Sequence, residues 1–192
     1  MPSHEREAGA RPVAMKILKA KVCLVGEGGV GKTSLIRRYV LNMFDDLYIR
    51  TIGTKVSKKT VDLVRPDVGP VRVEMMIWDI MGADDIRTLL RDEYFRGTSG
   101  AVAVADLTRR STFDELPVWT EGLERAAGDL PLVIAANKAD RVGEAGVETE
   151  EVVRTARNLG ADYLMTSAKT GENVEEAFRR LGDLVARDRL GP

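Results

Sequence analysis

The chain has 192 residues, of which 44% are hydrophobic and 31% are charged, and its 29 Lys and Arg nearly balance its 30 Asp and Glu. A chain of this length and composition can bury one substantial core and is typical of a soluble globular protein. The balanced charge gives no overall field that would favour nucleic acid or anionic lipid as a partner. The single cysteine, Cys23, excludes an internal disulfide and a multi-cysteine metal site. It favours a reducing compartment, so we expect a cytoplasmic protein.

Neither end of the sequence carries a recognisable membrane signal. No apolar run approaches the ~18–20 residues that span a bilayer, and the charged start, MPSHEREAGARPVA, has no apolar core of a signal peptide. The sequence begins Met-Pro, which excludes N-myristoylation, and its last residues, VARDRLGP, include no prenylatable cysteine. We expect a disordered tail over residues 1–14, a single domain over residues 15–190, and no direct lipid anchor.

Strand-like and helical patterns alternate along the rest of the chain. Strands are predicted over 17–25, 54–64, 71–78, 101–105, 130–136 and 163–165, and helices over 32–41, 111–127, 149–159 and 174–187. The prolines and glycine of residues 65–70 indicate a turn that joins two neighbouring strands as an antiparallel hairpin. The pattern predicts an α/β fold of three layers, in which helices cover both faces of a six-stranded, mostly parallel sheet with one antiparallel edge strand.

A glycine-rich segment lies between the first predicted strand and the first predicted helix. It reads Gly26-Glu-Gly-Gly-Val-Gly-Lys-Thr33 and fits the P-loop pattern G-x-x-x-x-G-K-[ST]. Glycines let consecutive backbone N–H groups face an anion, and the helix N-terminus adds a partial positive charge. In this pattern Lys32 reaches the β- and γ-phosphates and the Thr33 hydroxyl binds Mg²⁺. We therefore expect a P-loop NTPase fold with these nucleotide-binding residues: Glu27, Gly28, Gly29, Val30, Gly31, Lys32, Thr33 and Ser34.

Two further polar segments, Asn137-Lys-Ala-Asp140 and Thr166-Ser-Ala-Lys169, follow two successive predicted strands. A carboxylate at Asp140 can accept two hydrogen bonds from guanine, a donor pair that adenine lacks. A site built on such bonds rejects an analogue by roughly 10⁴–10⁵-fold. One such tetrapeptide would also fit a helix-capping turn, but two in succession after a phosphate loop favour guanine. We expect the Ala168 N–H to meet guanine O6 and two lysine stems to flank the ring; the predicted base-binding residues are Asn137, Lys138, Asp140, Ser167, Ala168 and Lys169.

Taken in order, the segments GEGGVGKT, YIRTIGT, WDIMG, NKAD and TSAK resemble the motifs of the Ras superfamily of small GTPases. Thr51-Ile-Gly53 and Trp78-Asp79 make the Rab branch the most similar one. The resemblance covers roughly residues 16–188 and is specific to the superfamily rather than to one branch.

The resemblance implies roles for residues outside the phosphate loop. Thr51 would bind Mg²⁺ and sense the γ-phosphate, Asp79 would hold Mg²⁺ through water, and the Gly82 N–H would meet the γ-phosphate. Phe44 would pack across the guanine ring, although a core phenylalanine is the alternative. In this family, GTP orders two loops that loosen after hydrolysis, and effector and regulator proteins respond to the difference.

One departure from the family concerns catalysis. Gly82-Ala83-Asp84 stands where the family normally has Gly-Gln-Glu, and that glutamine orients the attacking water. An alanine methyl group cannot orient water, and a carboxylate at Asp84 is disfavoured beside a triphosphate. Arg50 could stabilise transition-state charge in cis, a device that contributes ~10³–10⁵ in rate where it operates. The alternative for Arg50 is an exposed loop residue.

These features predict a monomeric molecular switch that binds GTP or GDP with Mg²⁺ and hydrolyses GTP slowly unless a partner assists. Its expected partners are effectors, an exchange factor and an activating protein. A GTP-locked pseudo-GTPase scaffold is the first alternative, and an ATP-dependent P-loop enzyme, disfavoured by Asp140, is the second. The expected catalytic residues are Lys32, Thr51, Gly82 and Arg50, and the expected metal ligands are Thr33, Thr51 and Asp79.

Overall fold

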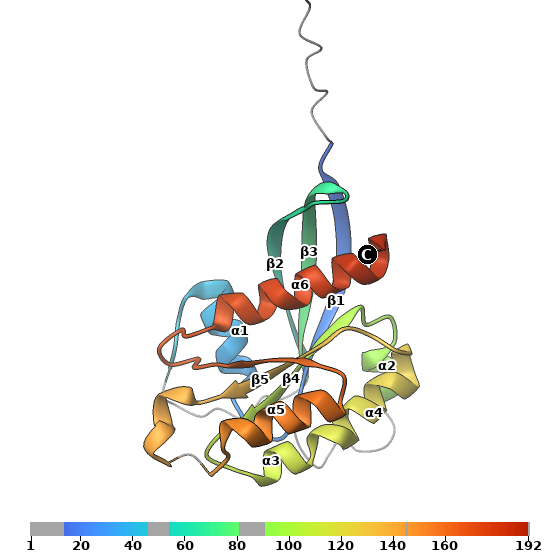
Figure 1. Ribbon diagram of the computed structural model, residues 1–192. Coiled ribbons are helices and arrows are strands. Elements are labelled where there is room, and N and C mark those ends of the chain that lie inside the picture. The colour runs from blue at the N-terminus through green and yellow to red at the C-terminus, as the bar shows by residue number, and fades with distance from the viewer. Residues whose placement is uncertain (1–13, 46–53, 81–90, 145, 192) are drawn as a thin grey trace, which may run out of the picture.

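The computed structural model describes residues 14–45, 54–80, 91–144 and 146–191 (Figure 1). The expected tail, apart from Ala14, lies outside the described residues. The same is true of these expected site and switch residues: Arg50, Thr51, Gly82, Ala83 and Asp84.

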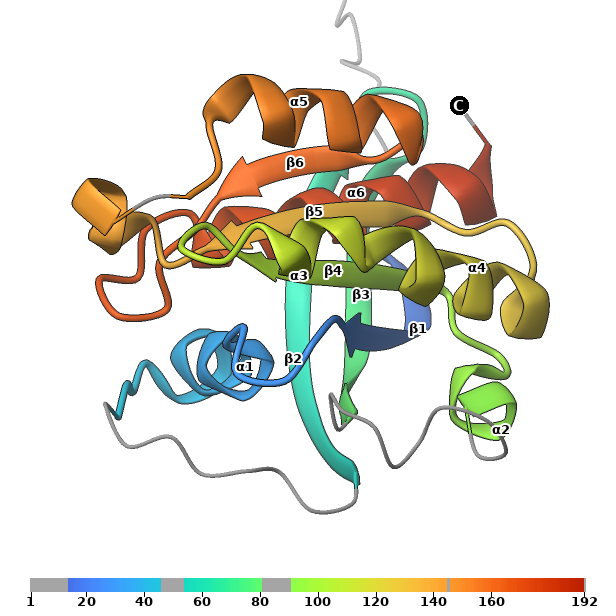
Figure 2. The ribbon, with the colours of Figure 1, turned by 90° about the horizontal axis from the view of Figure 1, so that it is seen from below.

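A six-stranded sheet of order β2-β3-β1-β4-β5-β6 runs through the molecule (Figures 1 and 2). Neighbouring strands are parallel except β2 and β3, which form an antiparallel hairpin at one edge. The predicted sheet is thereby confirmed. Its strands are β1 (Lys16–Val25), β2 (Thr54–Arg65), β3 (Gly69–Ile80), β4 (Gly100–Asp106), β5 (Leu132–Asn137) and β6 (Asp162–Met165).

Helices cover both faces of the sheet, as predicted. One cluster of buried side chains joins the sheet to α1 (Lys32–Leu41) and α6 (Val174–Leu190). A second cluster, on the opposite face, includes side chains of the helices α2 (Arg91–Phe95), α3 (Ser111–Asp114), α4 (Leu116–Ala127) and α5 (Thr149–Asn158). Within the described residues, no helix is both long enough and apolar enough to cross a bilayer.

The prediction of one continuous helix over residues 111–127 is wrong. The structure divides it into α3 and α4 at Glu115, with Pro117 in the first turn of α4. A proline has no N–H and its ring clashes with the carbonyl four residues earlier, so it is accommodated at the start of a helix rather than inside one. The break therefore follows from Pro117.

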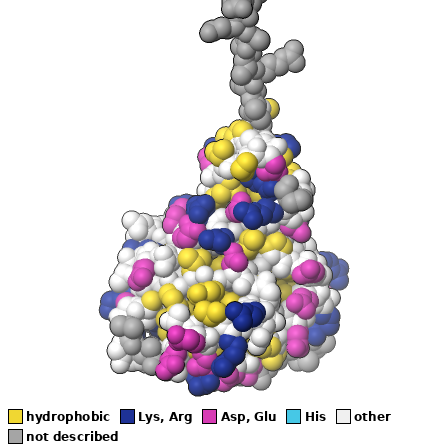
Figure 3. All heavy atoms as spheres, in the orientation of Figure 1, with side chains coloured by type: hydrophobic (Ala, Val, Ile, Leu, Met, Phe, Trp, Pro, Cys, Tyr) yellow, Lys and Arg dark blue, Asp and Glu magenta, His cyan; other side chains and the backbone are white. Residues whose placement is uncertain are grey.

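Basic and acidic side chains alternate on the face of the molecule that carries α6 (Figure 3). Along α6, Arg179 pairs with Glu176 at 2.7 Å and Arg187 pairs with Asp183 at 2.7 Å. Such pairs between residues three or four apart stabilise an exposed helix face modestly. The interspersed charges match the near-zero net charge of the whole chain.

The strands β1, β3, β4, β5 and β6 all run in the same direction, so their carboxyl ends lie along one side of the sheet. This carboxyl edge is distinct from the edge that the hairpin forms. Ligands of open α/β sheets bind outside the carboxyl edge. The carboxyl ends of these strands and the segments that follow them contain all the described residues expected to contact nucleotide or Mg²⁺ except Phe44.

Candidate functional site

The phosphate loop passes from β1 into the N-terminus of α1, packed tightly against the neighbouring strands. A Cβ at Gly26 would lie 2.1 Å from the Val104 carbonyl oxygen, and one at Gly31 would lie 2.2 Å from Asn137 Nδ2. Both glycines also have a positive φ, of 134° and 105° respectively. Only glycine fits this combination of backbone conformation and close approach. The structure therefore explains why glycine occupies these two positions of the P-loop pattern.

Lys32 is buried, with 6% of its surface exposed, against the loop backbone. Its ammonium group donates hydrogen bonds to the carbonyl oxygens of Gly26, at 2.6 Å, and Glu27, at 2.8 Å. Burial lowers the pKa of Lys32 to about 8, although the charges of Asp79 and Glu27 oppose that effect. The side chain remains mostly protonated at neutral pH and places a positive charge at the loop.

Thr33 and Asp79 form the described part of the candidate metal site. The Thr33 hydroxyl donates to Asp79 Oδ2 at 2.6 Å. Asp79 is only 2% exposed and its Oδ1 is buried with no hydrogen-bond partner among the described residues. Burial raises the pKa of this carboxyl despite the Thr33 hydrogen bond. A hydroxyl oxygen beside an unpaired, buried carboxylate oxygen suits Mg²⁺, which prefers oxygen ligands; the residues present therefore fit this ion.

Asn137 links the phosphate loop to both predicted base-binding segments. Its Nδ2 donates to the Val30 carbonyl oxygen at 2.8 Å, and its Oδ1 accepts from the Ala168 N–H at 3.2 Å. Asp140 Oδ1 accepts from the Ser167 hydroxyl at 2.6 Å, while Asp140 itself is exposed. The structure thus brings the three segments together and leaves a carboxylate accessible at the edge. The Ala168 N–H donates to Asn137 Oδ1, so the expected hydrogen bond from this N–H to guanine O6 stays a prediction.

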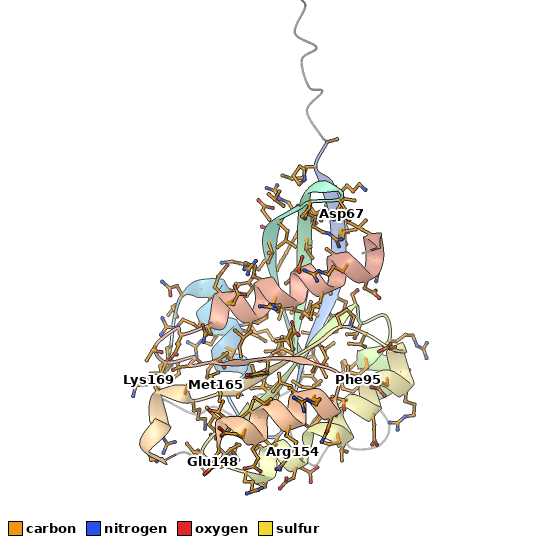
Figure 4. The ribbon with its side chains drawn as sticks, in the orientation of Figure 1. Asp67, Phe95, Glu148, Arg154, Met165 and Lys169 are labelled. Atoms are coloured by element: carbon orange, nitrogen blue, oxygen red, sulfur yellow. The ribbon has the colours of Figure 1, made fainter. Side chains whose placement is uncertain are left out.

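The remaining predicted base-binding side chains lie around this edge. Lys138 has a left-handed backbone, with φ of 69°, and its ammonium pairs with Asp106 at 2.6 Å. Lys169 is exposed and lies near Met165, the last residue of β6 (Figure 4). Phe44 is half-buried and packs against the α1 and α6 cluster. The core alternative for Phe44 therefore has a contact in its favour, and packing across guanine stays a prediction.

Asp106 and Arg38 are among the residues at this edge that the sequence analysis did not identify. Asp106, at the end of β4, is fully buried and accepts hydrogen bonds from Thr108, Arg109 and Lys138. Burial alone would raise the pKa of Asp106, but these hydrogen bonds together hold it below its usual value. A polar residue directly after an apolar strand was the available signal.

Arg38 makes a contact between α1 and the second base-binding segment. Its Nε donates to the Ala168 carbonyl oxygen at 2.8 Å, and its Nη2 donates to that of Lys169. The partners lie 130 and 131 residues away along the chain, and a helical arginine gives no local sign of such contacts. Arg38 thus holds the second base-binding segment through the backbone carbonyl groups of Ala168 and Lys169.

A phosphate loop joined through Asn137 to two segments at the edge of this sheet defines a P-loop small GTPase. The sequence profile described as "Ras family" matches residues 21–187. Ras-related protein Rab-13 of Canis lupus familiaris is 34% identical over 171 residues, which cover 88% of this chain and 79% of that protein. Ras-related protein RABC2a of Arabidopsis thaliana is 37% identical over 167 residues, which cover 85% of this chain and 76% of that protein. The chain belongs to the Ras family and is similar to its Rab members.

Proposed function

We propose that the protein is a switch that binds GTP and GDP with Mg²⁺ and hydrolyses GTP slowly unless a partner assists. The observation that carries this proposal is the hydrogen bond from Asn137 to Val30, because it joins the phosphate loop to the segment that presents the Asp140 carboxylate. Family membership supports guanine-nucleotide binding in general. Competition of GDP and ATP against a fluorescent guanine nucleotide tests the proposal; equal competition would instead support an ATP-dependent enzyme.

The chain's own groups would stabilise the phosphates electrostatically. Backbone N–H groups of the loop and the N-terminus of α1 face the anion, and the Lys32 ammonium adds a full positive charge. Thr33, Thr51 and, through water, Asp79 would hold Mg²⁺, which when bound neutralises charge on the phosphate oxygens. The Gly82 N–H would contact the γ-phosphate, and Asp140 would select guanine. These groups favour the transition state by charge and position, so they should support slow hydrolysis. Fast hydrolysis additionally needs a group that orients the attacking water.

Ala83 stands where that group is normally found, and it carries the proposal of slow turnover. Replacing Ala83 with glutamine is expected to raise the single-turnover rate of GTP hydrolysis by at least about tenfold, since a positioned side chain typically contributes ~10²–10⁴ to such a step. Nucleotide affinity should change little, because the amide would act on the transition state. Ala127→Gln, at the end of α4, serves as the control.

Two results would count against slow turnover caused by Ala83. One is a wild-type rate already above that of glutamine-bearing relatives, which would direct attention to Arg50 and Asp84. The other is a rate that Ala83→Gln leaves unchanged. Single-turnover assays with and without cell extract separate an assisted switch from the alternative, a GTP-locked scaffold, because only the switch should respond to an activating protein.

The Mg²⁺ proposal predicts a specific effect of Thr33→Ala. In the wild type, EDTA should accelerate GDP release strongly, because it would remove the ion that Thr33 and Asp79 would hold and that would neutralise phosphate charge. In Thr33→Ala the ratio of release rates with EDTA and with Mg²⁺ should approach one, since an oxygen ligand is lost. Thr33→Ser keeps the hydroxyl and should behave like the wild type. A Thr33→Ala protein with an unchanged ratio would remove Thr33 from the metal site.

The expected cellular setting is a cytoplasmic monomer that works through effector and regulator proteins. The lone described cysteine, Cys23, is buried and fits a reducing compartment. Proteins retained by the GTP-loaded form and not by the GDP-loaded form would identify the effectors. Sedimentation of both forms would test whether the chain is monomeric.

A further inference from the structure

Arg109 connects the loop after β4 with the middle of the phosphate loop. Its Nη2 donates to the Gly28 carbonyl oxygen at 2.9 Å, and its Nε donates to Asp106 Oδ2 at 3.0 Å. The two contacts use different nitrogens of one planar guanidinium group, so that each restricts the other. Arg109 belongs to none of the motifs that identify the family.

The anchor of this arginine is rigid. The Asp106 side chain is 1% exposed, and it also accepts from the Thr108 N–H at 2.9 Å and the Thr108 hydroxyl at 2.7 Å. The same carboxylate oxygen that binds Arg109 pairs with Lys138 in the first base-binding segment at 2.6 Å. A continuous set of contacts therefore runs from Gly28 through Arg109 and Asp106 to Lys138.

The contact with Gly28 has a directional consequence for the phosphate loop. In a planar trans peptide the C=O and the following N–H point in opposite directions, so a carbonyl of Gly28 held by Arg109 turns the Gly29 N–H away from that arginine. This peptide lies between two glycines, and Gly29 has a φ of 74°. Glycine loses more conformational freedom on ordering than any other residue. The hydrogen bond from Arg109 therefore restricts the orientation of this peptide more than it would that of a peptide between other residues.

We propose that Arg109 is a positioning residue, which fixes the Gly28–Gly29 peptide for phosphate binding and couples it to the base-binding segment, and thereby slows nucleotide release. The inference rests on the proposed binding of guanine nucleotide. Arg109 acts through the loop backbone and needs no direct contact with phosphate.

The neighbouring arginine provides a matched control. Arg110 pairs with Glu151 in α5, away from the phosphate loop, so Arg110→Ala removes the same charge from the same turn. The full-length protein is loaded with fluorescent GDP in Mg²⁺, and release is followed after excess unlabelled GDP is added. Arg109→Ala should release GDP about fivefold faster than the wild type, a reduced estimate for a charge-assisted hydrogen bond because the Arg109 side chain is 43% exposed. Arg110→Ala should stay within about twofold of the wild type.

A conservative variant and a spectroscopic readout separate positioning from general stability. Arg109→Lys can reach Gly28 or Asp106 with one ammonium group but lacks the fork, so its release rate should be intermediate. The ³¹P resonance of the β-phosphate of bound GDP should shift in Arg109→Ala and not in Arg110→Ala. Equal release rates for wild type and Arg109→Ala, or an equal acceleration by Arg110→Ala, would overturn the inference. A wild type that retains no GDP would instead overturn the proposed function.

Discussion

Replacing Asp140 with asparagine is expected to turn a guanine site into a xanthine site. The carboxylate would accept from guanine N1–H and the exocyclic amine, whereas an amide would present one donor in place of an acceptor. That donor opposes the guanine amine and matches the C2 oxygen of xanthine. With charge-assisted hydrogen bonds contributing about 1.5–3 kcal/mol each, affinity for GDP should fall by about 10²–10³-fold, while affinity for xanthosine diphosphate should exceed it.

The structure indicates that this substitution should change base recognition without disturbing the fold. Asp140 is exposed, and its Oδ1 accepts from Ser167 at 2.6 Å, a bond that an asparagine oxygen can also accept. The fold should therefore survive the change. Asp188→Asn, on an exposed position of α6, removes the same charge far along the chain and should leave both affinities unaltered. Undiminished GDP binding in Asp140→Asn, with no gain for the xanthine nucleotide, would show that the base is recognised elsewhere.

Lys32→Ala is expected to weaken the binding of GDP and GTP together by about tenfold to a hundredfold, because a buried charge-assisted interaction contributes about 1.5–3 kcal/mol and each 1.4 kcal/mol is a factor of ten. Lys32 also donates to the carbonyl oxygens of Gly26 and Glu27, so alanine would release the loop backbone as well. Calorimetry with each nucleotide measures the loss.

Two further variants identify the cause. Lys32→Met removes the ammonium group while keeping most of the aliphatic stem, so a loss similar to that of alanine would assign the effect to charge and hydrogen bonding rather than to packing. Lys58→Ala removes a lysine that is 64% exposed and pairs with Glu74 on the hairpin, and it should bind normally. Wild-type GDP affinity in Lys32→Ala would mean that this loop is not the nucleotide site.

The fold was largely predictable because its determinants are local. Apolar runs such as 101–105 identify the buried strands, and the prolines and glycine of 65–70 locate the hairpin turn. The division of the predicted helix 111–127 was missed, although Pro117 carried the signal, because a proline in a first turn and one inside a helix look alike until the boundary is known.

The candidate site likewise has some features that depend on neighbouring residues in the sequence and others that depend on residues far along the chain. The phosphate loop could be predicted because the conformation that it needs is encoded by adjacent glycines. The contacts of Arg38 and Arg109 could not, since their partners lie 130 and 81 residues away and the direction of a long side chain depends on tertiary packing. Predictions for Arg50 and Ala83 depend on residues outside those that the structure describes, and they await kinetics.

The close approach of Gly31 to Asn137 limits how this protein can diverge during evolution. A side chain at Gly31 would displace the Asn137 amide, and a change at Asn137 would release the phosphate loop, so each position constrains mutation at the other. Neither can drift without a simultaneous compensating change. Asp140 is free of this reciprocal constraint, because it is exposed and its described partner is the Ser167 hydroxyl, from which an asparagine oxygen can also accept a hydrogen bond. A lineage that acquired a different nucleobase preference would therefore be expected to do so through Asp140 while Gly31 and Asn137 stayed invariant.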